Sequence, residues 1–388
     1  MNRYYNPVRT VEGAGCAGRL EEILEGMDLS RKKVLLLAWG EGPLENPAFA
    51  GLLRGDGAFE VRPMVFRASN PTVEQLFDAY RRTKDFAPEV VVAVGGGSIL
   101  DVGKSLCCLY GKDLQSPDDL RSLIEEKAYG HPAARWIGIP TTAGTGSETT
   151  CWATIWDPEQ DAKRSVECQE NYAWAALVDP ELAAGMPRKL AVSSALDAVA
   201  HAVESYWARG SNCVSRALAL EAVRTIMVNM EDLLAGRPEA HDAMARGSML
   251  AGLAFSNTKT TACHSISYPL TMHYGIPHGT AVSMLLPPVL KLNAPQVAGM
   301  ERMLDALGTA DAEELGETVR GLLRRSGQPA TLRAWGVRRE DLPHMARLGM
   351  TKGRADNNPV PIDPATILSI LEQIYDPTDT YSTKQKGA

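Results

Sequence analysis

An aspartate and three histidines in the second half of the chain are suited to bind a divalent metal ion. Asp197 and His201 stand four residues apart in ALDAVAHAVESY, so on a helix both side chains leave one face. His264 and His278 follow in CHSISYPLTMHYGIPHG. One carboxylate and three imidazoles suit iron(II) or zinc, and four protein ligands leave room for a substrate oxygen in an expanded shell. Each residue alone could equally be an ordinary core or surface residue, because sequence spacing does not show that the four meet.

A run of glycines in the first half is suited to bind phosphate. The apolar run EVVVAV leads into Gly95-Gly96-Gly97-Ser98, and ILDVGK continues at helical spacing. Glycines between a buried strand and a helix let backbone N–H groups approach an anion at the positive helix end. A plain tight turn is the alternative interpretation, and the motif is not the Rossmann G-x-G-x-x-G.

A second loop of small residues, PTTAGTGSE at 140–148, follows the apolar run RWIGIP. Ligands of open α/β sheets bind where strands end, and hydroxyls with glycines suit ribose and phosphate oxygens. The alternative is a capping run before the next element.

The elements that must position these residues change in type near residue 187. Before it, apolar runs that predict buried strands alternate with helical stretches, at 33–38, 89–94, 135–140 and 175–179. After it, apolar residues recur at helical spacing over 189–208, 214–234, 241–254, 279–293 and 312–325. We therefore predict an α/β domain with a parallel sheet at 1–186 and an all-helical domain at 187–388, since 388 residues exceed one typical core.

Together these motifs resemble the iron-dependent (group III) alcohol dehydrogenases. GGGSILDVGK, PTTAGTGSE, ALVDPEL, the Asp197/His201 pair and His264 with PHG follow the family's order, and the resemblance covers roughly Val8 to Tyr375. It implies a dehydroquinate synthase-like architecture, with a nicotinamide-dinucleotide-binding first domain and a metal-binding, substrate-binding second domain. It also implies Fe(II) or Zn(II) on Asp197, His201, His264 and His278. The cofactor positions it implies are Asn70, Gly95, Gly96, Gly97, Ser98, Asp101, Thr141, Thr142, Thr145 and Ser147.

The chain departs from the family pattern in two places. Many members carry a second histidine four residues after the third ligand as a proton relay, and here that residue is Tyr268, so we expect Tyr268, His273 or water to transfer the proton. NAD-selective members often place an aspartate after the first strand, where this chain reads Ala38-Trp39-Gly40-Glu41. The cofactor is therefore NADPH or NADH, with a slight preference for NADPH, although Glu41 could still reach the ribose.

The expected reaction is hydride transfer between nicotinamide and a small aldehyde or alcohol. The segments SNTKTTACHSISYPLTMHYGIPHG and TKGRADNNPVPI resemble the branch that contains phosphonoacetaldehyde reductases. Lys259, Lys352 and Arg354 could form a cationic pocket for an anionic head group, or could be solvated surface. Sulfoacetaldehyde, succinic semialdehyde or a plain short aldehyde are the alternative substrates, and a dehydroquinate-synthase-type cyclase is the rival enzyme class.

Composition excludes several other functions. The net charge is −7, with no basic stripe, so neither nucleic acid nor an anionic membrane is an expected partner. No apolar run approaches 18 residues, and MNRYYNPVRT lacks the apolar core of a secretion signal. The seven scattered cysteines contain no C-x-x-C pair and are expected to be reduced thiols. We expect a cytoplasmic homodimer that acts on a diffusible substrate.

Overall fold

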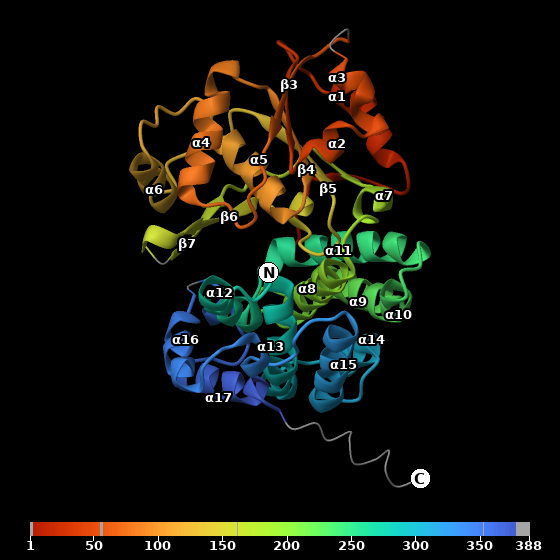
Figure 1. Cartoon of the computed structure of the whole chain (residues 1–388), viewed down its shortest axis with the longest axis vertical. Coiled ribbons are helices and arrows are strands. Elements are labelled where there is room, and N and C mark those ends of the chain that lie inside the picture. The colour runs from red at the N-terminus through yellow and green to blue at the C-terminus, as the bar shows by residue number, and fades with distance from the viewer. Residues whose placement is uncertain (1–2, 55–56, 161, 352, 378–388) are drawn as a thin grey trace. The chain divides into compact units, whose positions relative to one another are not determined.

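The predicted strands of the first half form a parallel sheet. The computed structural model describes residues 3–54, 57–160, 162–351 and 353–377. Six strands pair in parallel in the order β1-β8-β5-β4-β2-β3, and Figure 1 labels β3, β4 and β5 among them. They are β1 (Arg9–Glu12), β2 (Lys33–Ala38), β3 (Glu60–Val65), β4 (Val90–Gly95), β5 (Arg135–Pro140) and β8 (Ala175–Val178). The four apolar runs of the sequence are β2, β4, β5 and β8, so the α/β fold class is confirmed.

Helices cover both faces of this sheet. Successive side chains of a strand point to opposite faces, so Val34 and Leu36 of β2 face one way and Leu35 and Leu37 face the other. The first pair packs with α1 (Leu20–Glu25) and α3 (Ala50–Leu53). The second pair packs with α4 (Val73–Thr83), α5 (Gly97–Leu109) and α6 (Pro117–Glu125). Burial on both faces explains why these strands read as continuous apolar runs.

Four strands carry no such run, and the sequence did not predict them. β1 and β3 form the two edges of the sheet, and β3 reads EVRPMV, with a proline and two charges that an edge strand tolerates. The other two, β6 (Trp152–Asp157) and β7 (Ala162–Glu167), pair with each other as an antiparallel hairpin. Only strands buried on both faces gave a clear signal.

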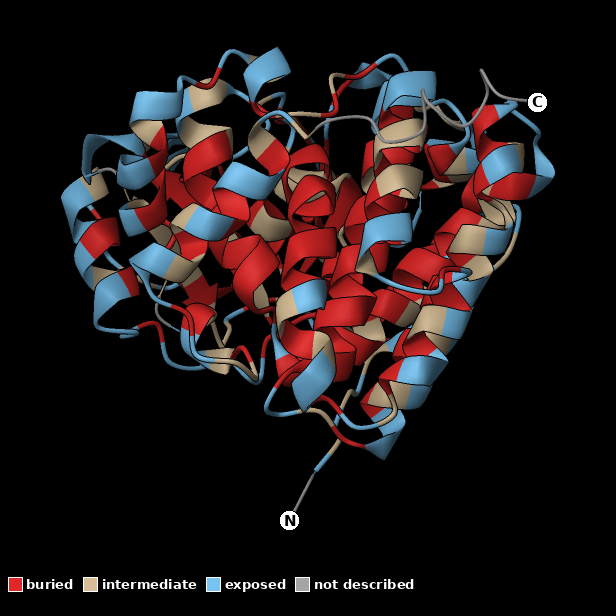
Figure 2. Ribbon diagram, turned by 90° about the horizontal axis from the view of Figure 1, so that it is seen from below, coloured by how far each residue is buried: buried red, intermediate tan, exposed pale blue. Residues whose placement is uncertain are grey.

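The second half is helical, as predicted. The helices are α8 (Arg188–Trp207), α9 (Cys213–Val228), α10 (Met230–Leu234), α11 (Glu239–Thr258), α12 (Ala262–Tyr274), α13 (His278–Asn293), α14 (Met300–Leu307), α15 (Ala312–Arg325), α16 (Leu342–Leu348) and α17 (Pro364–Tyr375). Almost every residue of α8 from Ala191 onward is buried, and Figure 2 shows buried helices beside others with an exposed outer face. The single helix predicted at 214–234 is two, because the chain leaves helical geometry at Asn229.

The chain forms two compact units whose boundaries differ from the two continuous domains expected. The sheet unit contains Tyr5–Met186 and Pro238–Ser256, and the helical unit contains the other described residues. Most of α11 therefore belongs with the sheet. A Cβ atom on Gly252 of α11 would lie 2.7 Å from the carbonyl oxygen of Gly146, so only glycine allows this close packing. Within the described residues, no helix combines the length and apolar character needed to cross a membrane.

Candidate metal centre and dinucleotide site

One face of α8 carries three buried ionisable side chains. Asp197, His201 and Glu204 follow one another at i, i+4 and i+7, which places them in line on one side of a helix. Their exposed fractions are 4%, 6% and 0%. Charged side chains are almost never this buried unless they have partners. This face of α8 is therefore the natural place to look for a bound cation.

α12 brings His264 to this face and completes a group of three possible ligands. One ligand atom from each of Asp197, His201 and His264 lies within 4.8 Å of the others. His264 Nε2 is 3.4 Å from Asp197 Oδ1, and His201 Nδ1 is 4.0 Å from Asp197 Oδ2. Neither Asp197 Oδ1 nor His264 Nε2 has a hydrogen-bond partner in the described part of the chain. Buried polar atoms without partners are costly, so a divalent cation between them fits the site.

His278, the fourth predicted ligand, lies beside this group rather than within it. It is the first residue of α13, half-buried, and its ring centre is 5.4 Å from that of His264. The start of α13 reaches α8 because the next residue is Gly279. A Cβ atom there would lie 2.2 Å from the Ser193 carbonyl oxygen and 3.1 Å from Asp197 Cβ. Gly279, the last residue of the PHG motif, is thus needed to bring His278 near the ligands, a packing role that the motif alone did not predict.

The charges of the cluster also favour a cation. Burial would lower the pKa of His264, but the carboxylates of Glu204 and Asp197 raise it above the ordinary value. Burial would likewise raise the pKa of Asp197, but the three histidines hold it well below the usual range. Two buried carboxylates thus draw positive charge into the site, which a metal ion can supply in place of a proton.

A stack of side chains leads from His278 to one of the two described cations predicted to bind substrate. The ring of Tyr268 is parallel to that of His278 within 6°, with centres 5.8 Å apart, and the Arg354 guanidinium lies 5.5 Å from the Tyr268 ring centre. Arg354 donates a hydrogen bond to Thr260, next to the exposed Lys259. Arg354 and Lys259 are therefore on adjoining segments. Lys352, the third predicted cation, lies outside the described residues.

The two residues predicted to transfer a proton differ in environment. Tyr268 is buried, and this burial raises its pKa to about 12 although Arg354 lowers it. Its hydroxyl therefore stays protonated near neutral pH. His273 is exposed near the end of α12, with its ring 6.2 Å from that of His344.

In the sheet unit, the glycine run opens α5. Gly96 is the N-cap residue, and the first backbone N–H groups of a helix have no partner within the helix, so they can bind an anion. The Ser98 hydroxyl accepts a hydrogen bond from the backbone N–H of Asn70. Asn70 is exposed and has a positive φ of 52°. Asn70, one of the predicted cofactor positions, and the predicted phosphate loop are thus adjacent.

The second loop packs directly on the first. The Thr141 N–H donates to the Gly95 carbonyl at 3.0 Å. A Cβ atom on Gly96 would lie 3.2 Å from Thr142 Cγ2, and one on Gly97 would lie 2.8 Å from Thr145 Cγ2. The absence of side chains at these glycines therefore lets the two loops pack together and also leaves the N-terminal end of α5 uncovered. Half-buried hydroxyls and a free helix end fit the phosphate and ribose oxygens of a dinucleotide.

Asp101 and Ser147 bond to each other inside this unit. The Ser147 hydroxyl donates to Asp101 Oδ1 at 2.7 Å, and the Thr154 N–H donates to Asp101 Oδ2 at 2.8 Å. Beneath them is Lys104, fully buried, whose ammonium donates to the carbonyls of Ser147 and Trp152 and to the Thr150 hydroxyl, each at 2.8 Å. Sequence reasoning missed Lys104, although a lysine one turn after Asp101 inside an apolar helix was a visible signal.

The end of β2, where nucleotide preference was expected to be set, carries an ion pair. Trp39 is 51% exposed, and the Glu41 carboxylate pairs with Arg67, two residues beyond β3. Because β2 and β3 are adjacent parallel strands, these residues lie at the same edge of the sheet.

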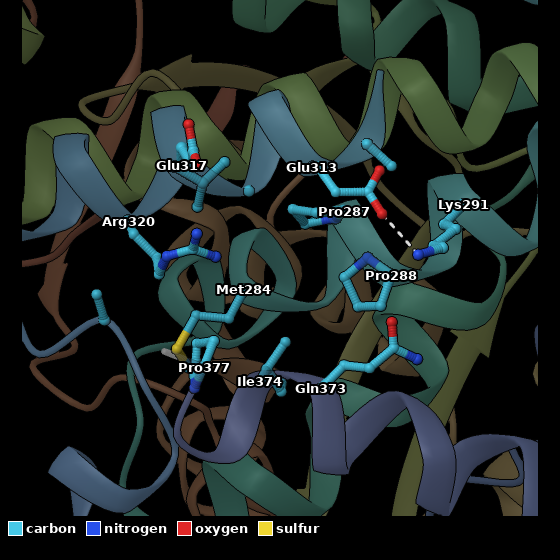
Figure 3. Close-up of a pocket in the computed structure, with 14 residues that line it drawn as sticks. Met284, Pro287, Pro288, Lys291, Glu313, Glu317, Arg320, Gln373, Ile374 and Pro377 are labelled. Carbon is cyan, nitrogen blue, oxygen red and sulfur yellow. Dashed lines mark hydrogen bonds and ion pairs between the residues drawn. The ribbon is translucent and has the colours of Figure 1, made fainter. Parts of the chain in front are cut away.

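The helical unit also has a hollow that none of the predicted ligands lines. Its volume is about 250 Å³, and it lies between α13, α15 and α17 (Figure 3). The labelled side chains include Arg320 and Glu317 on one side and the ion pair of Lys291 and Glu313 on the other.

Comparisons with known proteins point to one family over both halves of the chain. A family profile described as iron-containing alcohol dehydrogenase matches residues 7–180. A second profile, for the C-terminal part of the Fe-containing alcohol dehydrogenase family, matches residues 191–375.

Individual relatives are similar over most of their length. The NADPH-dependent butanol dehydrogenase of Clostridium saccharobutylicum is 27% identical over 92% of this chain and 95% of its own. The phosphonoacetaldehyde reductase of Streptomyces viridochromogenes is 31% identical over 68% of this chain and 71% of its own. The crystal structure of sulfoacetaldehyde reductase from Bifidobacterium kashiwanohense in complex with NAD+ superposes with a TM-score of 0.83 at 26% identity, covering 97% of this chain and 100% of that one.

Proposed function

The chain belongs to the iron-containing alcohol dehydrogenase family, and we propose that it reduces a short anionic aldehyde, with phosphonoacetaldehyde as the leading candidate, to the corresponding alcohol. As a member of that family it is an NAD(P)-dependent oxidoreductase that acts on a small alcohol or aldehyde. The observation that carries the proposal is the buried group of Asp197, His201 and His264, with His278 beside it.

These four side chains would hold the divalent ion. A bound ion would supply Lewis-acid polarisation of the substrate oxygen, and a bound nicotinamide would supply or accept the hydride. The mixed carboxylate and imidazole set suits either iron(II) or zinc. We propose iron(II) because the matching family is described as iron-containing. Three of these ligands already converge, because α8 presents Asp197 and His201 on the face that α12 covers with His264.

The loops of the sheet unit would hold the nicotinamide dinucleotide. The N-terminal end of α5, with Ser98, would bind the pyrophosphate, and Asn70 would lie on the adenosine side. Thr141, Thr142 and Thr145 would offer hydroxyls to the ribose and nicotinamide portion. Lys104, Asp101 and Ser147 would fix the second loop rather than touch the cofactor, since their polar groups are engaged with one another and with the backbone.

We propose NADPH as the preferred nucleotide. The Glu41 carboxylate is paired with Arg67 and is therefore less available to accept hydrogen bonds from a ribose 2′-hydroxyl. Arg67 could turn its guanidinium toward a 2′-phosphate, for which a planar cationic donor is well suited. One named relative is NADPH-dependent and another has a crystal structure in complex with NAD+, so family membership alone does not decide the nucleotide.

The preference for an anionic aldehyde is supported by the cations near His278. Arg354 lies one aromatic ring away from that histidine, and Lys259 is next to the threonine that Arg354 contacts. A phosphonate needs compensating positive charge when it leaves water, and a guanidinium can bind two of its oxygens at once. A neutral aldehyde carries no negative charge that these cations could compensate.

We propose that water delivers the proton that the product alcohol needs. Tyr268, in the place of the family's second histidine, has a pKa raised to about 12, which makes its hydroxyl a weaker proton donor than an ordinary tyrosine. Tyr268 would instead close one side of His278 by ring stacking. His273, which is exposed beside His344, would not be required.

The test is a coupled assay with metal-stripped protein reloaded with iron(II) or zinc. Oxidation of NADPH and of NADH would be followed with phosphonoacetaldehyde, sulfoacetaldehyde, succinic semialdehyde and propanal. The proposal predicts metal-dependent oxidation of NADPH that is faster with the anionic aldehydes than with propanal. Faster turnover of propanal would contradict the substrate class, and equal rates in stripped and reloaded protein would contradict the metal site.

A further inference from the structure

Glu204 is a fully buried carboxylate that lies behind one of the predicted metal ligands. Its exposed fraction is 0%, and it extends from α8 to the N-terminal end of α12. Oε1 accepts hydrogen bonds from the Thr261 hydroxyl and from the backbone N–H of Cys263, both at 2.7 Å. Oε2 is hydrogen-bonded to Nδ1 of His264. One carboxylate thus contacts both the start of α12 and the imidazole that α12 carries.

Glu204, a residue of α8, caps the N-terminal end of a different helix, α12. Thr261 is the N-cap residue of α12, and its own side chain makes no capping hydrogen bond within that helix. Glu204 supplies the missing acceptor, and a negative charge is favourable at the positive end of a helix. Trp207, three residues later on α8, donates its indole N–H to the Thr261 hydroxyl at 2.8 Å and fixes that hydroxyl toward Glu204. The Thr261 hydroxyl that the carboxylate contacts is therefore held in place.

The contact with His264 decides which of its nitrogens faces the metal ligands. An ionised carboxylate only accepts hydrogen bonds, so Nδ1 of His264 must carry the proton. In the neutral imidazole, Nε2 is then the atom with a free lone pair. That atom lies 3.4 Å from Asp197 Oδ1 and has no hydrogen-bond partner among the described residues.

We propose that Glu204 is a positioning residue that fixes the tautomer and direction of His264 and thereby sets the metal affinity of the site. The inference rests on the proposed function, since it requires that a metal ion binds there. Carboxylates behind metal-bound histidines typically contribute 10- to 100-fold in metal affinity.

Glu204→Gln is the decisive variant, because glutamine keeps the size of the side chain but has only one acceptor oxygen. If that oxygen stays on Thr261 and Cys263, the amide NH₂ faces His264 and forces Nδ1 to accept, which moves the imidazole proton to Nε2. We expect the affinity for zinc, measured by competition with a chelator, to fall 10- to 100-fold. Visible absorption of cobalt(II)-loaded protein gives a second readout of the ligand set that does not depend on activity.

Glu148→Gln is the matched control, because Glu148 is the other deeply buried glutamate of the chain's described part and belongs to the sheet unit. The zinc affinity of the Glu148→Gln protein should equal that of the unaltered protein. If Glu204→Gln does not fold, Glu204→Asp keeps the charge but is one methylene too short to reach both partners, and about tenfold weaker zinc binding is expected.

Unchanged zinc affinity in a folded Glu204 variant would overturn the positioning role while leaving the proposed function intact. Absence of zinc, cobalt and iron binding in the unaltered protein would instead overturn the proposed function itself.

Discussion

Single residues carry the chemistry, and the sequence predicted the proximity only of those that share one helical face. Asp197 and His201 stand on one helical face wherever that segment is helical, so their proximity could be predicted. Glu204 continues the same face at i+7, but a lone glutamate in an amphipathic pattern usually faces solvent. Only the packing of α12 against α8 shows that it is buried and bonded to His264.

Another buried carboxylate gives the protein a pH-dependent stability. Burial raises the pKa of Glu148 to about 7 from an ordinary 4.5, although Lys104 nearby lowers it. Because the folded-state pKa lies above the unfolded value, the contribution to stability is fully present below about pH 4.5 and is lost as pH rises through about 7. We expect Glu148→Gln, which cannot ionise, to gain stability relative to the unaltered protein between pH 5 and 8.5, by up to about 3 kcal/mol. Urea denaturation of both proteins at the two pH values measures this difference. An equal difference at both values would show that Glu148 does not titrate in this range.

At the scale of elements, several glycines allow two backbone segments to approach closely, and the sequence does not reveal which segments these are. The Gly95–Gly97 run was predicted from its place between strand and helix, and it does open α5. Gly252 gave no signal, and Gly279 was visible only as part of the PHG motif, because each is needed where one helix meets a particular backbone segment far away in sequence.

Gly279→Ala tests whether the start of α13 must lie this close to α8. The new Cβ atom would be 2.2 Å from the Ser193 carbonyl oxygen, so α13 must shift and carry His278 away from the other ligands. We expect a loss of stability of roughly 1–3 kcal/mol and about tenfold weaker zinc binding. Gly321→Ala is the control, because its Cβ atom would meet nothing within 4 Å in α15. Unweakened zinc binding in the Gly279 variant would show that His278 is dispensable as a ligand.

Gly96→Val tests the dinucleotide loops. Its side chain would press on Thr142 and cover the N-terminal end of α5, so nicotinamide binding should weaken by at least about tenfold while zinc binding is retained. Fluorescence titration with NADPH measures the effect, and circular dichroism checks the fold. Gly185→Val, where a Cβ atom meets nothing within 4 Å, should bind as the unaltered protein does. The same NADPH affinity in both variants would refute phosphate binding at this helix end.

For the whole molecule, the sequence predicted the change of fold class near residue 187 but not the return of the chain to the sheet unit at Pro238–Ser256. The apolar pattern of α11 identifies it as a helix, whereas its partner depends on the Gly252–Gly146 contact. The expected homodimer and cytoplasmic location stay predictions.

Substrate choice is a property of the complete enzyme. The Arg354→Met variant tests whether Arg354 contributes to the preference for an anionic aldehyde. Methionine keeps much of the side-chain length without the charge, and a charge-assisted hydrogen bond contributes roughly 1.5–3 kcal/mol. We expect kcat/KM for phosphonoacetaldehyde to fall about 10- to 100-fold, with little change for propanal. Lys259→Met should have the same selective effect. Equal losses for the charged and the uncharged aldehyde would mean that these residues support the fold or the metal site.

The central claim is that one metal ion, held by the residues of α8, α12 and α13, makes this protein an aldehyde reductase. Its most direct test is anaerobic titration of metal-stripped protein with iron(II), in which bound metal and NADPH oxidation with phosphonoacetaldehyde are measured together. The account predicts that activity rises in proportion to bound iron and saturates at about one ion per chain, and that His201→Ala, which removes one of the closest ligands, neither binds the ion tightly nor gains activity. Full activity in the stripped protein, or the same iron-dependent rise in the folded His201→Ala variant, would contradict it.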